Sequence, residues 1–200
     1  MAENNLQRKV MRLSIIGDSQ TGKSSILNVY LGNDFTYDIL SNIGIDKQSV
    51  EKQMKDGNKI KIIFWDTAGQ ERFHSLSSGT IKNSQGIIIC FALNDKQSFE
   101  NVILWLEDVR NVSEKIPIVL FGNKCDLVDE RKVTKEEIER FIKKNDLVYF
   151  ETSAKEKINL EEGFQKIFED AYATVVEQNA KFEIKRKKEE EENKKRKKKC

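Results

Sequence analysis

Residues 10–24, VMRLSIIGDSQTGKS, join a short apolar segment to a glycine-rich turn and to the start of a helical pattern. The apolar residues 10–16 are typical of a strand, and residues 23–31 are expected to form a helix that stops at Gly32. The turn at 17–24 has the pattern G-x-x-x-x-G-K-S, in which glycines let the backbone point several N–H groups into one concavity. This order of strand, turn and helix predicts a phosphate-binding loop.

The side chains of this loop suit a nucleoside triphosphate. Lys23 adds a positive charge near the β- and γ-phosphates, Ser24 offers a hydroxyl to Mg²⁺, and the helix that starts there adds its positive end. The residues expected to contact the nucleotide here are Ser19, Gln20, Thr21, Gly22, Lys23, Ser24 and Ser25.

The rest of the chain alternates strand and helix patterns. Further strands are expected at residues 45–54, 59–65, 86–92, 117–122 and 147–150, and helical spacing recurs at 99–109, 138–142 and 160–175. The Asp56–Gly57 turn makes the first two of these strands antiparallel. We therefore expect an α/β fold: a six-stranded, mostly parallel sheet with one antiparallel edge strand and helices on both faces. Ligands of such sheets bind outside the carboxyl ends of the strands.

Three motifs follow predicted strands at that edge, and they indicate which base is bound. They are DTAGQ at residues 66–70, NKCD at 123–126 and ETSAK at 151–155. A carboxylate such as that of Asp126 accepts hydrogen bonds from both N1–H and N2–H of guanine, whereas adenine has no matching pair of donors. The motifs therefore predict a guanine nucleotide.

Composition excludes several classes of protein. Of 200 residues, 34% are charged, and residues 181–199 hold 11 Lys or Arg and 5 Glu, so the rest has a slight acidic excess. This argues against a broadly cationic nucleic-acid-binding protein. Three cysteines are too few and too far apart for a disulfide framework or a zinc site. We find no 18-residue apolar run, no signal peptide and no glycine after the first methionine for myristoylation, which predicts a cytosolic chain unless its tail attaches it to a membrane.

The motifs GDSQTGKSS, IGID (43–46), KIIFWDTAGQERF (61–73), GNKCDL (122–127) and ETSAK resemble those of small GTPases of the Ras superfamily, and of Rab proteins in particular. The resemblance covers residues 9–176, which we take as one small GTPase domain between an N-terminal extension (1–8) and a charged hypervariable tail (177–200). It implies a P-loop GTPase fold and a monomeric switch that binds GTP or GDP with Mg²⁺, hydrolyses GTP slowly and acts in vesicle trafficking.

The resemblance also implies roles for single residues. Gln70 would orient the attacking water, and Gly69 would sense the γ-phosphate through its N–H. Mg²⁺ would be held by Ser24, by Asp66 through a water molecule and by Asn42. The further nucleotide contacts that it implies are Asp34, Phe35 edge-on to the guanine, Asn42, Asn123, Lys124, Asp126, Ser153, Ala154 through its N–H, and Lys155.

The chain departs from the Rab pattern in the first switch, around residues 41–44, and in the phosphate loop. Asn42 replaces the threonine whose hydroxyl ligates Mg²⁺, and Ile39 replaces an aromatic residue. In the phosphate loop, Gln20 replaces a small residue. Lys47 and residues 80–84 replace aromatics of the surface that Rab effectors contact. Effectors, a GTPase-activating protein and an exchange factor would bind residues 35–47 and 68–84.

Three functions stay open: a hydrolysing switch, a nucleotide-binding scaffold with little hydrolysis, and a disfavoured P-loop kinase, for which no lid or acceptor site is visible.

Six consecutive basic residues precede Cys200, and residues 181–200 have no apolar face that a core can bury. This is similar to the prenylated tail of a Rab, although it is not a C-a-a-X box and has one cysteine rather than a pair. A basic run and a lipid on Cys200 would give reversible membrane attachment, and a plain solvated tail is the alternative.

Other conspicuous residues have simpler interpretations. His74, the single histidine, is expected to be solvated, and the cysteines at 90 and 125 are expected to pack in or beside strands. Trp65 and Trp105 are expected in the core or at an interface rather than against a nucleobase.

Overall fold

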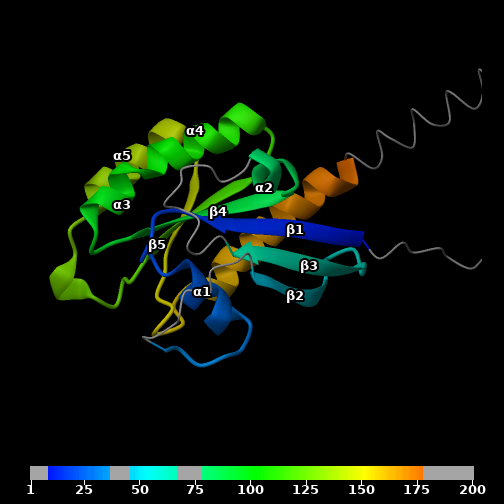
Figure 1. The fold of residues 1–200 in the computed structure, drawn as a ribbon, viewed down its shortest axis with the longest axis horizontal. Helices are drawn as coiled ribbons and strands as arrows, with labels where there is room; N and C mark the ends of the chain where they lie inside the picture. Colours follow the sequence, from blue (N-terminus) through cyan, green and yellow to red (C-terminus); the bar gives the residue numbers. More distant parts are fainter. Residues whose placement is uncertain (1–8, 37–45, 67–77, 178–200) are drawn as a thin grey trace, which may run out of the picture.

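A computed structural model of the chain describes residues 9–36, 46–66 and 78–177. Six strands form one sheet in the order β2-β3-β1-β4-β5-β6 (Figure 1). Their bounds are β1 Lys9–Ile16, β2 Asp46–Gln53, β3 Lys59–Asp66, β4 Gly86–Ala92, β5 Ile118–Asn123 and β6 Val148–Glu151. Only the edge pair β2–β3 is antiparallel among these strands, and β1 lies parallel between β3 and β4. The predicted fold class is confirmed.

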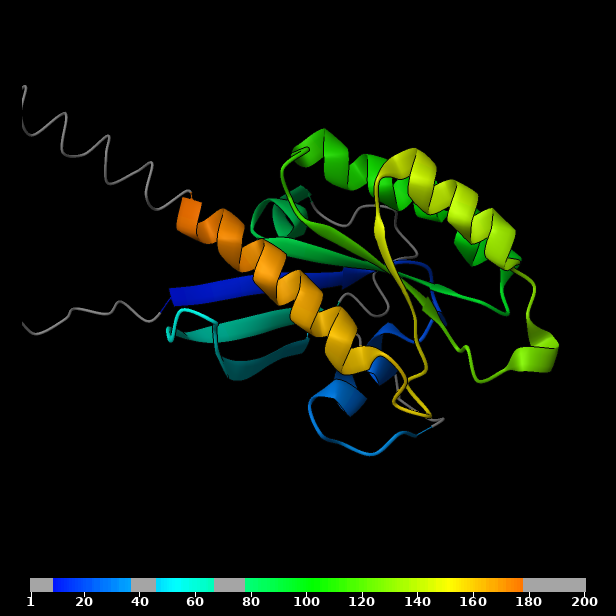
Figure 2. The same ribbon diagram turned by 180° about the vertical axis from the view of Figure 1, so that it is seen from behind.

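Helices lie on both faces of the sheet (Figures 1 and 2). They are α1 Lys23–Tyr30, α2 Ser78–Lys82, α3 Lys96–Glu100, α4 Val102–Val112, the 3₁₀ turn η2 Val128–Glu130, α5 Lys135–Asn145, and a C-terminal helix that begins at residue 160 and continues to 177, the last residue described. Within the described ranges, none of these helices is both long enough and apolar enough to cross a membrane.

The alternation of buried side chains along the strands divides the core into two clusters. Leu13 and Ile15 of β1 pack with α1 and the C-terminal helix, where the rings of Tyr30 and Phe164 stack with centroids 3.8 Å apart. Ile87 and Ile89 of β4 belong to the opposite cluster, with α3, α4 and α5. Every residue of β4 is buried, as predicted for a strand that is covered on both faces.

One helix predicted over residues 99–109 is two helices in the structure. Asp95 caps α3 by accepting a hydrogen bond from the N–H of Gln97. Asn101 ends α3 by donating its N–H to the carbonyl of Gln97, and it begins α4 by accepting from the N–H of Trp105 at 3.3 Å. Asn101 therefore lies at a fixed junction that the spacing of apolar residues does not reveal.

The β2–β3 hairpin is fastened to the C-terminal helix. The hydroxyl of Tyr172 donates to the carboxylate of Asp56 at 2.6 Å, and the amide of Asn58 donates to the same hydroxyl at 2.9 Å. Two ion pairs continue this contact along the helix, Lys55 with Glu169 at 2.9 Å and Lys52 with Glu161 at 3.0 Å. The helix that leads into the tail is thus tied to the hairpin at several points.

Candidate functional site

The turn between β1 and α1 requires glycine at two positions. Gly17 and Gly22 have φ values of 133° and 91°, in the region that L side chains rarely adopt. A Cβ on Gly17 would lie 2.0 Å from the carbonyl oxygen of Cys90, and one on Gly22 would lie 2.3 Å from Nδ2 of Asn123. Gln20 takes a left-handed conformation without being glycine, at φ 62°.

Lys23 lies inside this turn with only 4% of its surface exposed. Its ammonium donates to the carbonyl oxygens of Gly17 at 2.9 Å and Asp18 at 2.7 Å. The hydroxyl of Thr21 also donates to the Asp18 carbonyl, at 2.9 Å. A buried ammonium within a ring of backbone groups at a helix N-terminus is suited to bind an anion, because phosphate oxygens attract it more strongly than carbonyl dipoles do.

Asn123, at the end of β5, joins this turn to the loop after β6. Its Nδ2 donates to the carbonyl of Thr21 at 2.9 Å, and its Oδ1 accepts from the backbone N–H of Ala154 at 3.3 Å. The side chain is 2% exposed, so both bonds are shielded from water. The phosphate loop and the ETSAK motif at 151–155 therefore meet at Asn123, the first residue of the NKCD motif.

The loops after β5 and β6 are also bound to each other. The hydroxyl of Ser153 donates to the carboxylate of Asp126 at 2.6 Å, and the N–H of Cys125 donates to the carbonyl of Thr152 at 3.0 Å. Lys124 adopts a left-handed conformation with φ 66°, which turns the chain directly after β5. Asp126 thus lies beside Ser153 and Ala154, where a carboxylate that could hydrogen-bond to guanine is expected.

A bidentate ion pair supports these loops from outside. The guanidinium of Arg131 donates to both carboxylate oxygens of Glu151, at 2.6 and 3.0 Å. This hydrogen bonding lowers the pKa of Glu151 below its usual range. Burial raises the pKa of the nearby Cys125 thiol, which keeps it protonated at neutral pH and agrees with a packing role rather than a reactive one.

The carboxylate of Asp18 has partners that the sequence motifs do not indicate. It accepts hydrogen bonds from Nδ2 of Asn101 at 2.5 Å and from the indole N–H of Trp105 at 2.7 Å. Trp105 is buried, as expected for a core tryptophan on a helix. The position of Trp105 on a helix predicts a buried ring, but the sequence does not predict which group accepts the hydrogen bond from the indole N–H.

A sequence model of the Ras family matches residues 12–173. The chain belongs to the Ras family. It is 38% identical over 167 residues to the Ras-related protein Rab11A of Lotus japonicus, covering 83% of this chain and 74% of the relative. It is 36% identical over 162 residues to Rab-13 of Rattus norvegicus, covering 80% and 79%, and 37% identical over 162 residues to Rab-10 of Diplobatis ommata, covering 80% of each. The predicted resemblance to Rab proteins is confirmed, and this Ras-family chain is a Rab-like small GTPase.

The other predicted site residues of this Ras-family protein differ in burial, and some lie outside the described ranges. Ser24 and Ser25 are half-buried in the first turn of α1, while Ser19, Asp34 and Lys155 are exposed. Phe35 is partly buried and packs against the core cluster that contains α1. Asp66 ends β3, but its side chain is outside the described part of the structure. The predicted residues that lie wholly outside the described ranges are Ile39, Asn42, Gly69, Gln70, His74 and Cys200.

The described residues of the Ras-family domain contain no cluster of three or more His, Cys, Asp or Glu side chains that could hold a metal ion. A Mg²⁺ site of the expected kind needs no such cluster, because Mg²⁺ retains waters and takes substrate phosphates as ligands beside one or two protein groups. The position of Ser24 at the start of α1, next to the buried Lys23, fits that arrangement.

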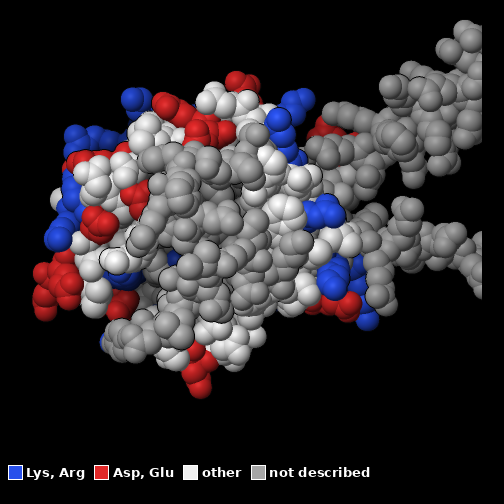
Figure 3. Space-filling model, viewed as in Figure 1, with Lys and Arg blue, Asp and Glu red and all other residues white. Residues whose placement is uncertain are grey.

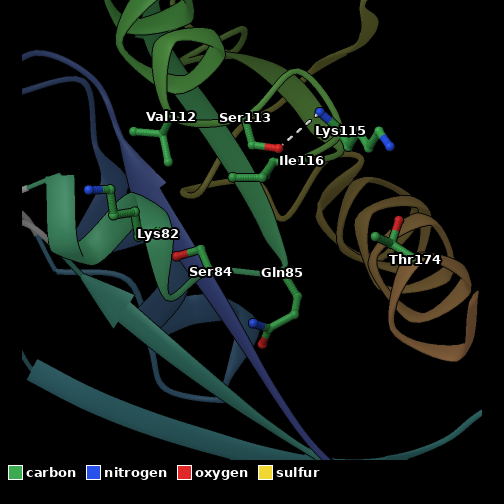
Figure 4. A pocket seen from close by; sticks show the side chains of 8 residues that line it. All are labelled: Lys82, Ser84, Gln85, Val112, Ser113, Lys115, Ile116 and Thr174. Atoms are coloured by element: carbon green, nitrogen blue, oxygen red, sulfur yellow. Dashed lines mark hydrogen bonds between the residues drawn. The ribbon is translucent and has the colours of Figure 1, made fainter. Parts of the chain in front are cut away.

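A cavity of about 230 Å³ lies at the opposite end of the Ras-family domain, before β4 and β5 (Figure 4). Its rim includes Lys82 and Lys115, whose amino groups point away from each other, so two cations do not converge there. On the face seen in Figure 3, acidic and basic side chains intermingle over α3 and α5. Neither feature competes with the loops around Asn123 as a nucleotide site.

Proposed function

We propose that this Ras-family chain is a guanine-nucleotide-dependent switch that binds GDP and GTP with Mg²⁺, hydrolyses GTP slowly and acts in membrane trafficking. The observation that carries the proposal is the position of Asn123, whose amide contacts both Thr21 of the phosphate loop and Ala154 of the base loop. A ligand with phosphates at one end and a base at the other would meet a single connected site.

The phosphate end of the nucleotide would be held by backbone N–H groups of residues 19–25 and by Lys23. Ser24, Asp66 and Asn42 would hold Mg²⁺, which neutralises phosphate charge when it is bound. Glycine at 17 and 22 lets the loop lie close against β4 and Asn123, because a Cβ at either position would lie within 2.3 Å of a neighbouring atom. The close packing at these two glycines holds the loop in its curved shape and supports phosphate binding.

The base end would select guanine through Asp126. Ser153 already donates to one carboxylate oxygen of Asp126, which fixes the orientation of the group before a base arrives. Lys124 would brace the base loop, and Lys155 and the N–H of Ala154 would complete its contacts with guanine.

Hydrolysis would depend on the segments 35–47 and 68–84, through Gln70 and Gly69 in the second segment. Phosphoryl transfer in this class relies on positioning and on charge stabilisation, and an arginine from a partner protein often contributes about 10³–10⁵ in rate. We therefore expect slow intrinsic turnover, faster with an activating protein, and expect effectors and an exchange factor to bind the same two segments.

One observation favours a second function, a nucleotide-binding scaffold with little hydrolysis. Gln20 is an exposed residue in a left-handed conformation within the phosphate loop, at a position expected near the γ-phosphate where Rab proteins usually have a small residue. Together with Asn42 in place of threonine, this would weaken the response to the third phosphate.

The test is to identify the nucleotide that co-purifies with the protein and to follow bound GTP over time. The switch predicts bound GDP or GTP, negligible ATP, and conversion of GTP to GDP that stops in Gln70→Leu. Asn42→Thr is expected to tighten Mg²⁺ binding in the GTP state. Retention of guanine nucleotide without turnover in any variant would favour the scaffold, and equal affinity for ATP and GTP would contradict both functions.

A further inference from the structure

Asp18 is held by both its backbone and its side chain. Its carbonyl oxygen accepts from the ammonium of Lys23 and the hydroxyl of Thr21, both within the phosphate loop. Its carboxylate accepts from Nδ2 of Asn101 and from the indole N–H of Trp105. One residue therefore connects the lysine of the loop to the junction of α3 and α4.

The two side-chain donors come from a rigid part of the fold. Trp105 is 2% exposed, within the cluster that packs α4 against β4. Asn101 is fixed at the helix junction, where its Oδ1 also accepts from Nε2 of Gln97 at 3.1 Å. Hydrogen bonds to a carboxylate are stronger than those between neutral groups, so this pair of donors fixes the rotamer of Asp18.

The direction of the Asp18 carboxylate matters for the chemistry of the loop. A carboxylate repels phosphate groups, and its charge would oppose that of Lys23 if the side chain turned toward the ammonium. Donors on α4 hold it toward that helix, while the carbonyl of the same residue stays in contact with Lys23. Release of the carboxylate would disturb the backbone that positions the ammonium.

We propose that Trp105 and Asn101 are positioning residues for the phosphate-binding loop and act through Asp18. The inference rests on the proposed binding of guanine nucleotides. Both residues lie outside the nucleotide motifs, and both donate to the loop through the carboxylate of Asp18. They preorganise the loop and thereby slow nucleotide release, since a loop already in its binding conformation loses less freedom on binding.

The experiment measures the dissociation rate of a fluorescent GDP analogue from four proteins: wild type, Trp105→Phe, Asp18→Ala and the double variant. Phenylalanine retains an aromatic ring in the core but lacks the N–H. We expect Trp105→Phe to release the analogue about tenfold faster, the order expected for one hydrogen bond to a charged group. In the Asp18→Ala background, the same change should have no further effect.

This non-additivity separates positioning from packing, because a ring that acts only through the core would have equal effects in both backgrounds. Arg110→Ala is the matched control, since Arg110 is on the same helix but donates to the carbonyl of Asn145 at 2.7 Å. Its loss should lower stability in urea without changing the release rate. Asn101→Ala repeats the cycle in case Trp105→Phe does not fold.

Equal acceleration in both backgrounds, or an unchanged rate in Trp105→Phe and Asn101→Ala, would overturn the positioning role while leaving nucleotide binding intact. A wild-type protein that retains no guanine nucleotide would overturn the proposed function, and the positioning role with it. The two failures are therefore distinguishable within one series of measurements.

Discussion

Ser153 and Asp126 form a short hydrogen bond across the two loops that follow β5 and β6, with 2.6 Å between hydroxyl and carboxylate oxygens. Ser153 in turn accepts from the N–H of Glu156 at 3.0 Å, so the hydroxyl is itself oriented by the backbone. The acidic group is thus held by the loop opposite its own, and the position of its second oxygen follows from the fold rather than from a bound base.

This arrangement predicts that Asp126→Asn changes base preference. An amide in place of the carboxylate loses an acceptor for guanine and gains a donor that suits the extra carbonyl of xanthine. We expect GDP affinity to fall by about 100-fold or more, which is about 3 kcal/mol for the loss of a charge-assisted pair, and XDP affinity to rise. Competition binding with both nucleotides measures this. Asp129→Asn, an exposed change of the same charge, should leave the preference unaltered.

Asn123→Ala should release the phosphate loop from the base loop. The change removes the bonds to Thr21 and Ala154 and leaves their buried backbone groups without these partners. We expect a loss of about 2–3 kcal/mol in the free energy of unfolding together with faster GDP release. Urea denaturation and a release assay report the two effects. Asn33→Ala removes an exposed amide bond to Asn28 and should change neither, so equal effects in both variants would contradict the bridge.

Gly17→Ala tests the close approach of the loop to β4. The new Cβ would lie 2.0 Å from the carbonyl oxygen of Cys90, a backbone atom that cannot move without displacing the strand. We expect a cost of about 3 kcal/mol or more and loss of nucleotide binding. Gly32→Ala has a similar positive φ of 93°, but its Cβ meets no described atom within 4 Å. That control should be destabilised by only about 1 kcal/mol of backbone strain and should retain nucleotide, as measured by thermal unfolding and bound GDP.

Arg131→Gln should destabilise the protein in a pH-dependent way. Because Arg131 lowers the folded-state pKa of Glu151 from its ordinary 4.5, the stabilisation is present above that pH and is lost as the pH falls through the lower folded value. The two side chains are 24% and 27% exposed, and we expect a cost of about 1–2 kcal/mol at neutral pH.

Urea denaturation at neutral pH and well below pH 4.5 measures this difference between the Arg131→Gln variant and the wild type. The difference should shrink at the acidic pH, and a difference independent of pH would argue against the ion pair as its cause. Lys55→Gln removes a pair whose lysine is 81% exposed, and it should cost less than about 0.5 kcal/mol at either pH.

Cys200→Ser should abolish membrane attachment in cells. A basic run contributes about 1 kcal/mol per charge near an anionic leaflet, and a single lipid chain supplies the second signal that stable anchoring needs. Cell fractionation should find the wild type on membranes, with less of it there at high salt, and the variant in the soluble fraction. Cys125→Ser, which changes a half-buried cysteine, should stay on membranes. A serine variant that remained membrane-bound would show that Cys200 is not the anchor.

Local patterns were sufficient to predict the sheet and the position of the phosphate loop. β4 was recognisable because residues 86–92, GIIICFA, form a nearly continuous apolar run, and the structure buries all seven. The hairpin was recognisable because Asp56–Gly57 separates two strands. The predicted α1 ends within one residue of the observed Tyr30, since Leu31 and Gly32 close the helix. In each case the determining information lies within a few neighbouring residues.

Contacts between distant residues were not predictable in this way. Asn101 and Trp105 are 83 and 87 positions from Asp18, and neither has an unusual neighbour in sequence. Trp105 has the spacing of an ordinary core residue, and its N–H finds an acceptor only after the sheet has brought α4 beside the end of β1. Hydrogen bonds of this kind depend on the assembled fold, so one sequence contains no local pattern for them.

The attachment of the C-terminal helix to the hairpin also sets how the domain would bear tension. A pull on the end of this helix would first strain the contact of Tyr172 with Asp56, then the pair formed by Glu169, and then that formed by Glu161. These bonds lie at the β2 edge of the sheet, whereas Asp126 follows β5 near the opposite edge. Force transmitted along the tail would therefore peel the helix from the hairpin, one bond after another, before it reached the loops that surround the base.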